Sequence, residues 1–243
     1  MFEKLTNATL KIESGNSSGS GFHFVDKQII VTNYHVILSA IQDPSLPIIG
    51  ITEKGISYRL QIISYSSIDQ YDFAILHSID KVEDDRIALQ PKVSDRVRRG
   101  TDIIFAGYPH GISHLLVHKA VVSGYPNDKS FYIDGSVNGG NSGGPVVDMS
   151  DFSVVGIVTQ RRFLGNVELH KISDEATQLQ DYCNKMQGNG SVNIMGIDFT
   201  AFAKMIGKSF AISNAIIESN ANSGIGIGFN IKYVTERYNS LPK

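Results

Sequence analysis

Short apolar segments separated by turn residues fill the first 160 residues of the chain, and this pattern constrains the fold most. The segments are rich in Val, Ile, Phe and Tyr, and many alternate apolar with polar residues, which is typical of β-strands. Short strands with no long helix between them favour an antiparallel sandwich or barrel over a parallel α/β sheet. The predicted strands are SGFHFVD, QIIVTNYHV, ISYRLQIISYS, FAILHSI, TDIIFAGYP, LLVHKAVVSGY, SFYIDGSV, PVVDM and SVVGIVTQ.

The pattern changes after Arg162. Residues 173–187 predict a helix with Ser173 as its N-cap, because acidic residues fill the first turn. Residues 198–218 predict a second helix with Asp198 as its N-cap and an apolar stripe at helical spacing. The segment GIGIGFNIKYV then returns to the alternation of a strand.

The composition is that of an ordinary globular protein, with 42% hydrophobic and 19% charged residues among 243. A formal net charge of −2 gives no indication of a nucleic-acid or membrane partner. Cys183, the one cysteine, cannot form an internal disulfide, and the first residues lack the apolar core of a secretory leader. We therefore expect a soluble, cytoplasmic protein.

Three motifs contain the residue types that a nucleophilic hydrolase needs. VTNYHV contains His35, QYDFAILHS contains Asp72, and NGGNSGGPVV contains Ser142. A serine hydroxyl is a weak nucleophile until a base takes its proton, and histidine can accept that proton and return it to a leaving group. A carboxylate orients the imidazole and stabilises its charged form. We expect Ser142 as nucleophile, His35 as general base and acid, and Asp72 as the orienting carboxylate.

Glycines surround the serine in the segment GGNSGGPV, residues 139–146. A plain exposed turn explains such a segment on its own. The alternative is that the backbone must come close to a reacting group. The backbone N–H groups of Gly140 and Ser142 would then form an oxyanion hole, which a tetrahedral intermediate requires.

The chain resembles the trypsin/chymotrypsin-like serine proteases, and within them it is most similar to the HtrA-type branch. The resemblance rests on the motifs SGSGFHF, IVTNYHV, YDFAILH, GYPHG, DGSVNGGNSGGPVVD, VVGIV and GIGFNI, in that order. It implies a mainly β protein with two six-stranded antiparallel barrels, with His35 and Asp72 on the first and Ser142 on the second. The implied organisation is a single protease domain over residues 1–243, with the first barrel at about 5–90 and the second at about 100–236.

Two departures from the family pattern are informative. Asn141 stands where classical trypsins carry an aspartate that pairs with a new N-terminus, so activation by N-terminal insertion is not expected. Residues 161–223 separate two motifs that the family joins by a short loop, which predicts a helical insertion in the second barrel. The insertion is either a passive surface element or a site for a regulatory protein partner or self-association.

The resemblance also implies a substrate pocket, lined by Ser136, Ile157, Val158 and Thr159. Ser136 would lie near its base without a charge, which disfavours cleavage after Lys or Arg. Related glutamyl endopeptidases carry a histidine where Val158 falls, which disfavours cleavage after acidic residues. We expect a small or medium apolar residue on the acyl side of the scissile bond, the P1 position.

No metal or cofactor is expected. His114 and His118 are four residues apart, but their segment reads as a strand, where the two would lie roughly 13 Å apart. The predicted function is a serine endopeptidase that acts on polypeptides through an acyl-enzyme on Ser142. The alternatives are a latent protease that a partner activates through residues 161–223, and an inactive binding module with the same barrels.

Overall fold

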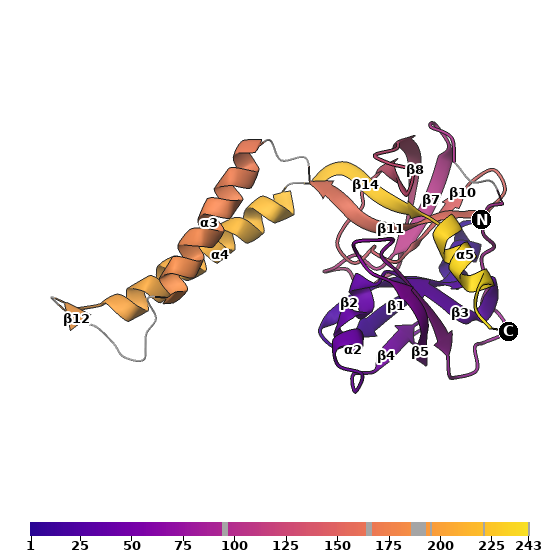
Figure 1. Ribbon diagram of the computed structural model, residues 1–243, viewed down its shortest axis with the longest axis horizontal. Helices are drawn as coiled ribbons and strands as arrows, with labels where there is room; N and C mark the ends of the chain where they lie inside the picture. The colour runs from indigo at the N-terminus through magenta and orange to yellow at the C-terminus, as the bar shows by residue number, and fades with distance from the viewer. Residues whose placement is uncertain (94–96, 164–166, 186–192, 195, 221, 243) are drawn as a thin grey trace. The chain divides into compact units, whose positions relative to one another are not determined.

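The computed structural model describes residues 1–93, 97–163, 167–185, 193–194, 196–220 and 222–242 (Figure 1). The chain divides into two compact units. One comprises Met1–Arg162 together with Gly224–Lys243, and the other comprises Phe163–Ser223. Among the described residues, no helix is both long and apolar enough to cross a membrane.

The first barrel closes from six antiparallel strands in the order β1-β2-β3-β6-β5-β4. Two of its strands, β1 (TLKIES) and β4 (IIGI), were not among the predicted ones, although β4 is rich in isoleucine and follows a proline. The strands are β1 (Thr9–Ser14), β2 (Ser17–Phe24), β3 (Asp26–Thr32), β4 (Ile48–Ile51), β5 (Ser57–Ser66) and β6 (Phe73–Ser78).

The second barrel closes in the order β10-β11-β14-β9-β8-β7, so β14 lies beside β11 although the helical unit separates them in the chain (Figure 1). The predicted fold class, two closed six-stranded antiparallel barrels with a helical insertion in the second, is thereby confirmed. The strands are β7 (Asp102–Gly107), β8 (Leu116–Gly124), β9 (Ser130–Asp134), β10 (Pro145–Asp148), β11 (Val154–Phe163) and β14 (Asn222–Asn230).

The helical unit contains α3 (Val167–Lys185) and α4 (Phe199–Asn220), joined through the two-residue strands β12 (Asn193–Ile194) and β13 (Ile197–Asp198). Asp198 caps α4 as predicted, because its Oδ1 accepts hydrogen bonds from the backbone N–H groups of Thr200 (2.9 Å) and Ala201 (3.1 Å). The prediction that Ser173 caps the first helix is wrong. The preceding VELHKI segment consists largely of residues compatible with a helix, so α3 begins earlier and contains Ser173.

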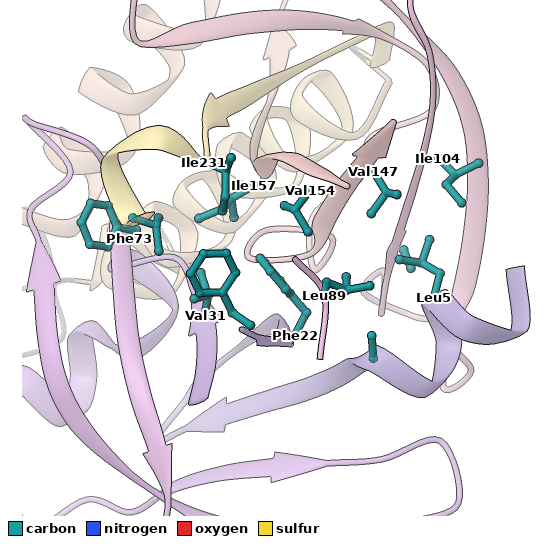
Figure 2. Packing of buried hydrophobic residues seen from close by; sticks show 14 of the residues in the cluster. Leu5, Phe22, Val31, Phe73, Leu89, Ile104, Val147, Val154, Ile157 and Ile231 are labelled. Atoms are coloured by element: carbon teal, nitrogen blue, oxygen red, sulfur yellow. The ribbon is translucent and has the colours of Figure 1, made fainter. Parts of the chain in front are cut away.

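Large side chains from both barrels pack together in one continuous hydrophobic core. Phe22 and Val31 of the first barrel are fully buried in the same cluster as Val154 and Ile157 of the second (Figure 2). Burial of a side chain of this size typically contributes about 2–3 kcal/mol. Because they share this core, the two barrels form one packed body. The position of each barrel relative to the other is therefore fixed, and so are the surfaces on which the site residues lie.

Short helices close the ends of this body. They are α1 (Phe2–Ala8), the 3₁₀ turn η1 (His35–Ile37), α2 (Leu38–Gln42) and α5 (Lys232–Asn239). The C-terminal α5 returns to the first barrel, where the ring of Tyr233 stacks on that of Tyr71 at a centroid distance of 4.0 Å. Tyr71 directly precedes Asp72, so this stack supports the turn that carries one of the predicted site residues.

A histidine is buried in the first barrel beside a buried arginine. The Nε of Arg86 donates to Nε2 of His23 (3.3 Å), and its Nη2 donates to the carbonyl oxygen of Thr9 (2.7 Å). His23 is fully buried, and burial together with the charge of Arg86 lowers its pKa from 6.5 to about 4. The imidazole is therefore neutral in the folded protein at neutral pH.

This pKa predicts a loss of stability in mild acid. Below pH 6.5 the unfolded chain takes up a proton at His23 before the folded one does, so the free energy of unfolding falls as the pH drops toward 4. A shift of this size corresponds to roughly 3 kcal/mol. Urea unfolding of wild type and His23→Gln between pH 4 and 7 should show that the variant lacks this part of the pH dependence.

The change His77→Gln is the matched control, because His77 is exposed on β6. This control should keep the wild-type pH dependence. Parallel pH profiles for wild type and His23→Gln would contradict the prediction.

Candidate active site

Asp72 lies in the turn between β5 and β6 with its backbone in the left-handed region, at a φ of 43°. Such a conformation costs free energy for a residue other than glycine, so neighbouring contacts must hold it. The backbone N–H of Asp72 donates to the carbonyl oxygen of Ser67 (3.0 Å), and the Nδ2 of Asn33 donates to the carbonyl oxygen of Asp72 (2.6 Å). These bonds fix the direction in which the carboxylate projects.

The Asp72 carboxylate is fully buried and accepts three hydrogen bonds. The donors are Nδ1 of His35 (2.8 Å), the backbone N–H of His35 (3.1 Å) and Oγ1 of Thr159 (2.6 Å). An ionised carboxylate only accepts, so Nδ1 of His35 carries the hydrogen in this pair and Nε2 is free to act as an acceptor. The imidazole is 31% exposed, which leaves it open to a substrate.

Ser142 lies in the loop between β9 and β10, where the neighbouring glycines meet a strict steric demand. Gly140 and Gly143 have φ values of 91° and 88°. A Cβ atom at Gly140 would collide with the carbonyl oxygen of Tyr108, and one at Gly143 with the carbonyl oxygen of Ser20. The glycine pattern therefore reflects close backbone approach rather than a plain exposed turn, within the second barrel at Gly140 and between the two barrels at Gly143.

Ser20 on β2 anchors this loop to the first barrel, a role that the sequence analysis did not assign. Its hydroxyl donates to the carbonyl oxygen of Gly140 (2.7 Å) and accepts from the backbone N–H of Tyr108 (2.9 Å). Its own N–H donates to the carbonyl oxygen of Ser142 (2.7 Å). The sequence SGSGF could have indicated this role, because it places a hydroxyl between two glycines. Glycines within a strand often mark a place where another backbone approaches closely.

The two backbone N–H groups predicted to form an oxyanion hole have no hydrogen-bond acceptor among the described residues. Within the described residues, the N–H groups of Gly140 and Ser142 donate to no protein acceptor. Two backbone hydrogen bonds fix the neighbouring peptide groups. The N–H of His110 donates to the carbonyl oxygen of Gly139 (2.7 Å), and the N–H of Asn141 donates to the carbonyl oxygen of Asn138 (3.0 Å). This loop has donors available for an incoming oxygen.

The Ser142 hydroxyl is hydrogen-bonded to Thr159 and not to His35. Its Oγ donates to the carbonyl oxygen of Thr159 (2.9 Å), and among the described contacts it makes no hydrogen bond to the imidazole. Thr159 thus contacts Asp72 through its side chain and Ser142 through its backbone. The structure brings together His35, Asp72 and the loop of Ser142, but leaves the serine on a different acceptor.

The four residues predicted to line a substrate pocket lie in different surroundings. Ile157 is buried in the core shared by the barrels, and Val158 is buried in the core of the second barrel beside Val137. Thr159 contacts Asp72, and Ser136 is exposed. Their assignment to a pocket stays a prediction.

His118, one of the two histidines weighed as metal ligands, lies on β8 and stacks on the ring of Phe105 at a centroid distance of 4.7 Å. Burial lowers its pKa. This stack gives the side chain a packing role within the second barrel.

Comparison with known proteins relates this chain to trypsin-like peptidases. A family profile described as a trypsin-like peptidase domain matches residues 19–157. A probable periplasmic serine endoprotease, DegP-like, from Rhizobium meliloti is 27% identical over 223 residues, covering 85% of this chain and 42% of that protein. The chloroplastic Protease Do-like 5 of Arabidopsis thaliana is 32% identical over 155 residues, covering 56% and 46%. The mouse serine protease HTRA3 is 29% identical over 203 residues, covering 74% and 41%.

Solved structures with the same fold include the crystal structure of Deg5, with a TM-score of 0.53 and 27% identity, covering 65% of this chain and 81% of that one. The serine endoprotease from Yersinia pestis has a TM-score of 0.55 and 21% identity, covering 71% and 64%. At that identity the likeness shows the fold alone. The chain spans less than half the length of the three curated relatives described above.

The Thr159 hydroxyl should contribute to stability through its bond to the buried carboxylate. We predict that Thr159→Val, which keeps the side-chain shape, lowers the free energy of unfolding by about 1.5–3 kcal/mol, the usual range for a hydrogen bond to a charged group. Urea unfolding at neutral pH measures the change. The same substitution at half-buried Thr101 is the control, and an equal loss in both variants would contradict the prediction.

Proposed function

Because this chain belongs to the trypsin-like peptidase family, of the HtrA type, we propose that it is a serine endopeptidase that cleaves polypeptides through an acyl-enzyme on Ser142. The observation that carries the proposal is the buried Asp72 carboxylate bonded to Nδ1 of His35. This bond leaves the other imidazole nitrogen free to accept a proton, which is what a general base requires.

In the proposed reaction, Ser142 Oγ gives its proton to Nε2 of His35 and attacks the scissile carbonyl carbon. The negative charge on the carbonyl oxygen is stabilised by the N–H groups of Gly140 and Ser142, which are free of protein acceptors in the described chain. The imidazolium then protonates the leaving amine, and water releases the acyl group by the reverse transfers. Asp72 stabilises the imidazolium throughout.

One step must precede this chemistry, because Ser142 Oγ donates to Thr159 rather than to His35. The hydroxyl must leave this carbonyl oxygen before it can donate to His35, and rotation about the serine side-chain torsion breaks the bond to Thr159. This observation favours a second candidate, a latent protease in which a partner at residues 161–223 or a bound substrate completes the site. An inactive binding module is the less favoured candidate, because binding alone does not require a buried carboxylate that is hydrogen-bonded to a histidine.

Labelling with a fluorophosphonate probe tests the proposal directly. Wild-type protein should be labelled, whereas Ser142→Ala and His35→Ala should not, because the first lacks the nucleophile and the second its base. Turnover of a peptide substrate should fall by about 10⁴-fold or more in both variants. His77→Ala, at an exposed histidine outside the site, is the control and should be labelled like wild type.

The result distinguishes the candidates. Labelling that persists in Ser142→Ala would overturn the assignment of the nucleophile. A wild type that is labelled only after a candidate substrate or partner is added would identify the latent protease. A folded wild type that no addition activates would leave the binding module.

We further propose a small or medium apolar P1 preference, since Ser136 brings no charge to the predicted pocket base. A carboxylate there would attract a basic P1 side chain. Ser136→Asp should therefore raise kcat/KM for substrates with P1 Lys or Arg by at least about 10-fold relative to P1 Val, whereas the uncharged Ser136→Asn should not. Profiling with a peptide library measures this ratio, and an unchanged ratio in Ser136→Asp would exclude Ser136 from the pocket.

The cytoplasmic location belongs to the proposal as well. It rests on the single cysteine, whereas two of the relatives are named as periplasmic and chloroplastic.

A further inference from the structure

The turn at residues 67–72, which carries the Asp72 carboxylate, needs support from outside itself. The backbone N–H groups of residues 70–72 all donate to the carbonyl oxygen of Ser67, at 3.0 to 3.1 Å. The side chains of residues 68–70 are exposed, and the left-handed backbone of Asp72 is costly to hold. Tyr71 is half-buried and packs against the core that the two barrels share, so its side chain ties the turn to the packed body.

The ring of Tyr71 has partners from two other parts of this body. Tyr233 of α5 stacks on it at a centroid distance of 4.0 Å and an interplanar angle of 19°. The Nζ of Lys129, in the loop between β8 and β9, lies over the same ring at 4.8 Å from its centroid. Contacts of both kinds depend on ring orientation, so they favour one position of Tyr71. That position is therefore set by the C-terminal helix and by the second barrel.

The end of β14 places both partners of Tyr71. The backbone N–H of Asn230 donates to the carbonyl oxygen of Lys129 (2.9 Å). The Oδ1 of Asn230 accepts from the backbone N–H of Lys232 (2.9 Å), where α5 begins, and Tyr233 is the next residue. One residue of the second barrel thus fixes the backbone beside Lys129 and beside Tyr233. The turn that carries Asp72 on the first barrel is supported from the second.

A surface cavity of about 260 Å³ opens beside this stack, and its lining includes Tyr71, Phe73 and Tyr233. Water can enter such an opening. A shorter side chain at position 233 would therefore leave the Tyr71 ring against water, rather than draw a neighbouring side chain onto it.

A second tyrosine of α5 offers an internal comparison. Tyr238 packs edge to face on Phe24, at a centroid distance of 6.1 Å and an interplanar angle of 83°. Like Tyr233, it is half-buried and packs against the shared core. Phe24 ends β2 and belongs neither to the turn nor to the site. The two tyrosines therefore dock the same helix on the same barrel, but only Tyr233 does so on the neighbour of Asp72.

We propose that Tyr233 is a positioning residue: by stacking on Tyr71 it holds the Asp72 carboxylate in place against Nδ1 of His35, a bond of 2.8 Å. The inference rests on the proposed function, because His35 is the base of that reaction. Without the stack the turn can shift, and the carboxylate then no longer fixes the orientation of the imidazole. A misplacement of about 1 Å, caused by a change away from the reacting atoms, can lower a rate by about 100-fold.

The test compares leucine substitutions at the two tyrosines of α5. Tyr233→Leu should lower kcat for a peptide substrate by about 10- to 100-fold and leave KM within about threefold, because the base is misplaced while substrate contacts remain. Tyr238→Leu makes the same change on the same helix, and Tyr233→Phe keeps the stack, so both should retain kcat within about twofold. Tyr71→Leu/Tyr233→Leu should lose no more activity than either single variant, because both changes remove one contact. Urea unfolding should show similar losses of stability in Tyr233→Leu and Tyr238→Leu.

The proton on Nδ1 of His35 gives a readout that does not require turnover. Because it is bonded to a buried carboxylate, it should give a downfield ¹H NMR resonance that is absent from His35→Gln. This resonance should persist in Tyr238→Leu and be broadened or lost in Tyr233→Leu.

The two readouts separate the inference from the proposed function. A wild type without turnover that shows this difference between the resonances would contradict the proposed function and keep the positioning role. Equal losses of kcat in Tyr233→Leu and Tyr238→Leu, or an unchanged resonance in Tyr233→Leu, would overturn the positioning role. If Tyr233→Leu does not fold, Tyr233→Met, which keeps a longer apolar side chain but no ring, takes its place with the same expected results.

Discussion

A buried carboxylate organises this protein. Asp72 is removed from water, and an ionised group in that position is tolerated only if donors replace its hydration. Two of its three donors come from His35 on the first barrel and the third from Thr159 on the second. The carboxylate therefore requires both barrels to be folded and packed, and the same packing brings the Ser142 loop to the histidine. Ser20 provides the return connection, from the first barrel to the loop on the second.

Most of the fold could be predicted from the sequence. The alternation of apolar and polar residues and the turn residues are local signals, and packing in the barrels does not change the secondary structure that they predict. Nine predicted strands in the first 160 residues, and the late strand β14, are present. The short β1 and β4 were missed, although the equally short β10 was predicted. They pair with each other to close the first barrel, and such a long-range contact cannot be read from the local sequence. The start of α3 was misplaced because Ser173 is compatible with a cap and with a helix interior, and only the fold decides between them.

The residue types of the site could be predicted from the sequence, but fewer of its contacts could. The glycines around Ser142 indicated a close approach, and the structure supplies the colliding atoms. The acceptor of the Ser142 hydroxyl could not be predicted, because it depends on a single side-chain torsion and on a carbonyl seventeen positions away in the chain. The exposure of Phe202, Met205 and Ile212 on α4 could likewise not be predicted, since a helical stripe of Phe, Met and Ile looks the same whether it faces a neighbouring helix or solvent.

The position of the helical unit between β11 and β14 has a consequence for the order of folding. All six strands of the first barrel lie within the first 78 residues, whereas the second barrel lacks β14 until residue 230 has been made. During synthesis the first barrel can therefore close while the strand edges of β11 and β9 are still unpaired. The α3–α4 hairpin lies between these two strands in the chain, so a hairpin formed in that interval would shorten the search that the last strand must make.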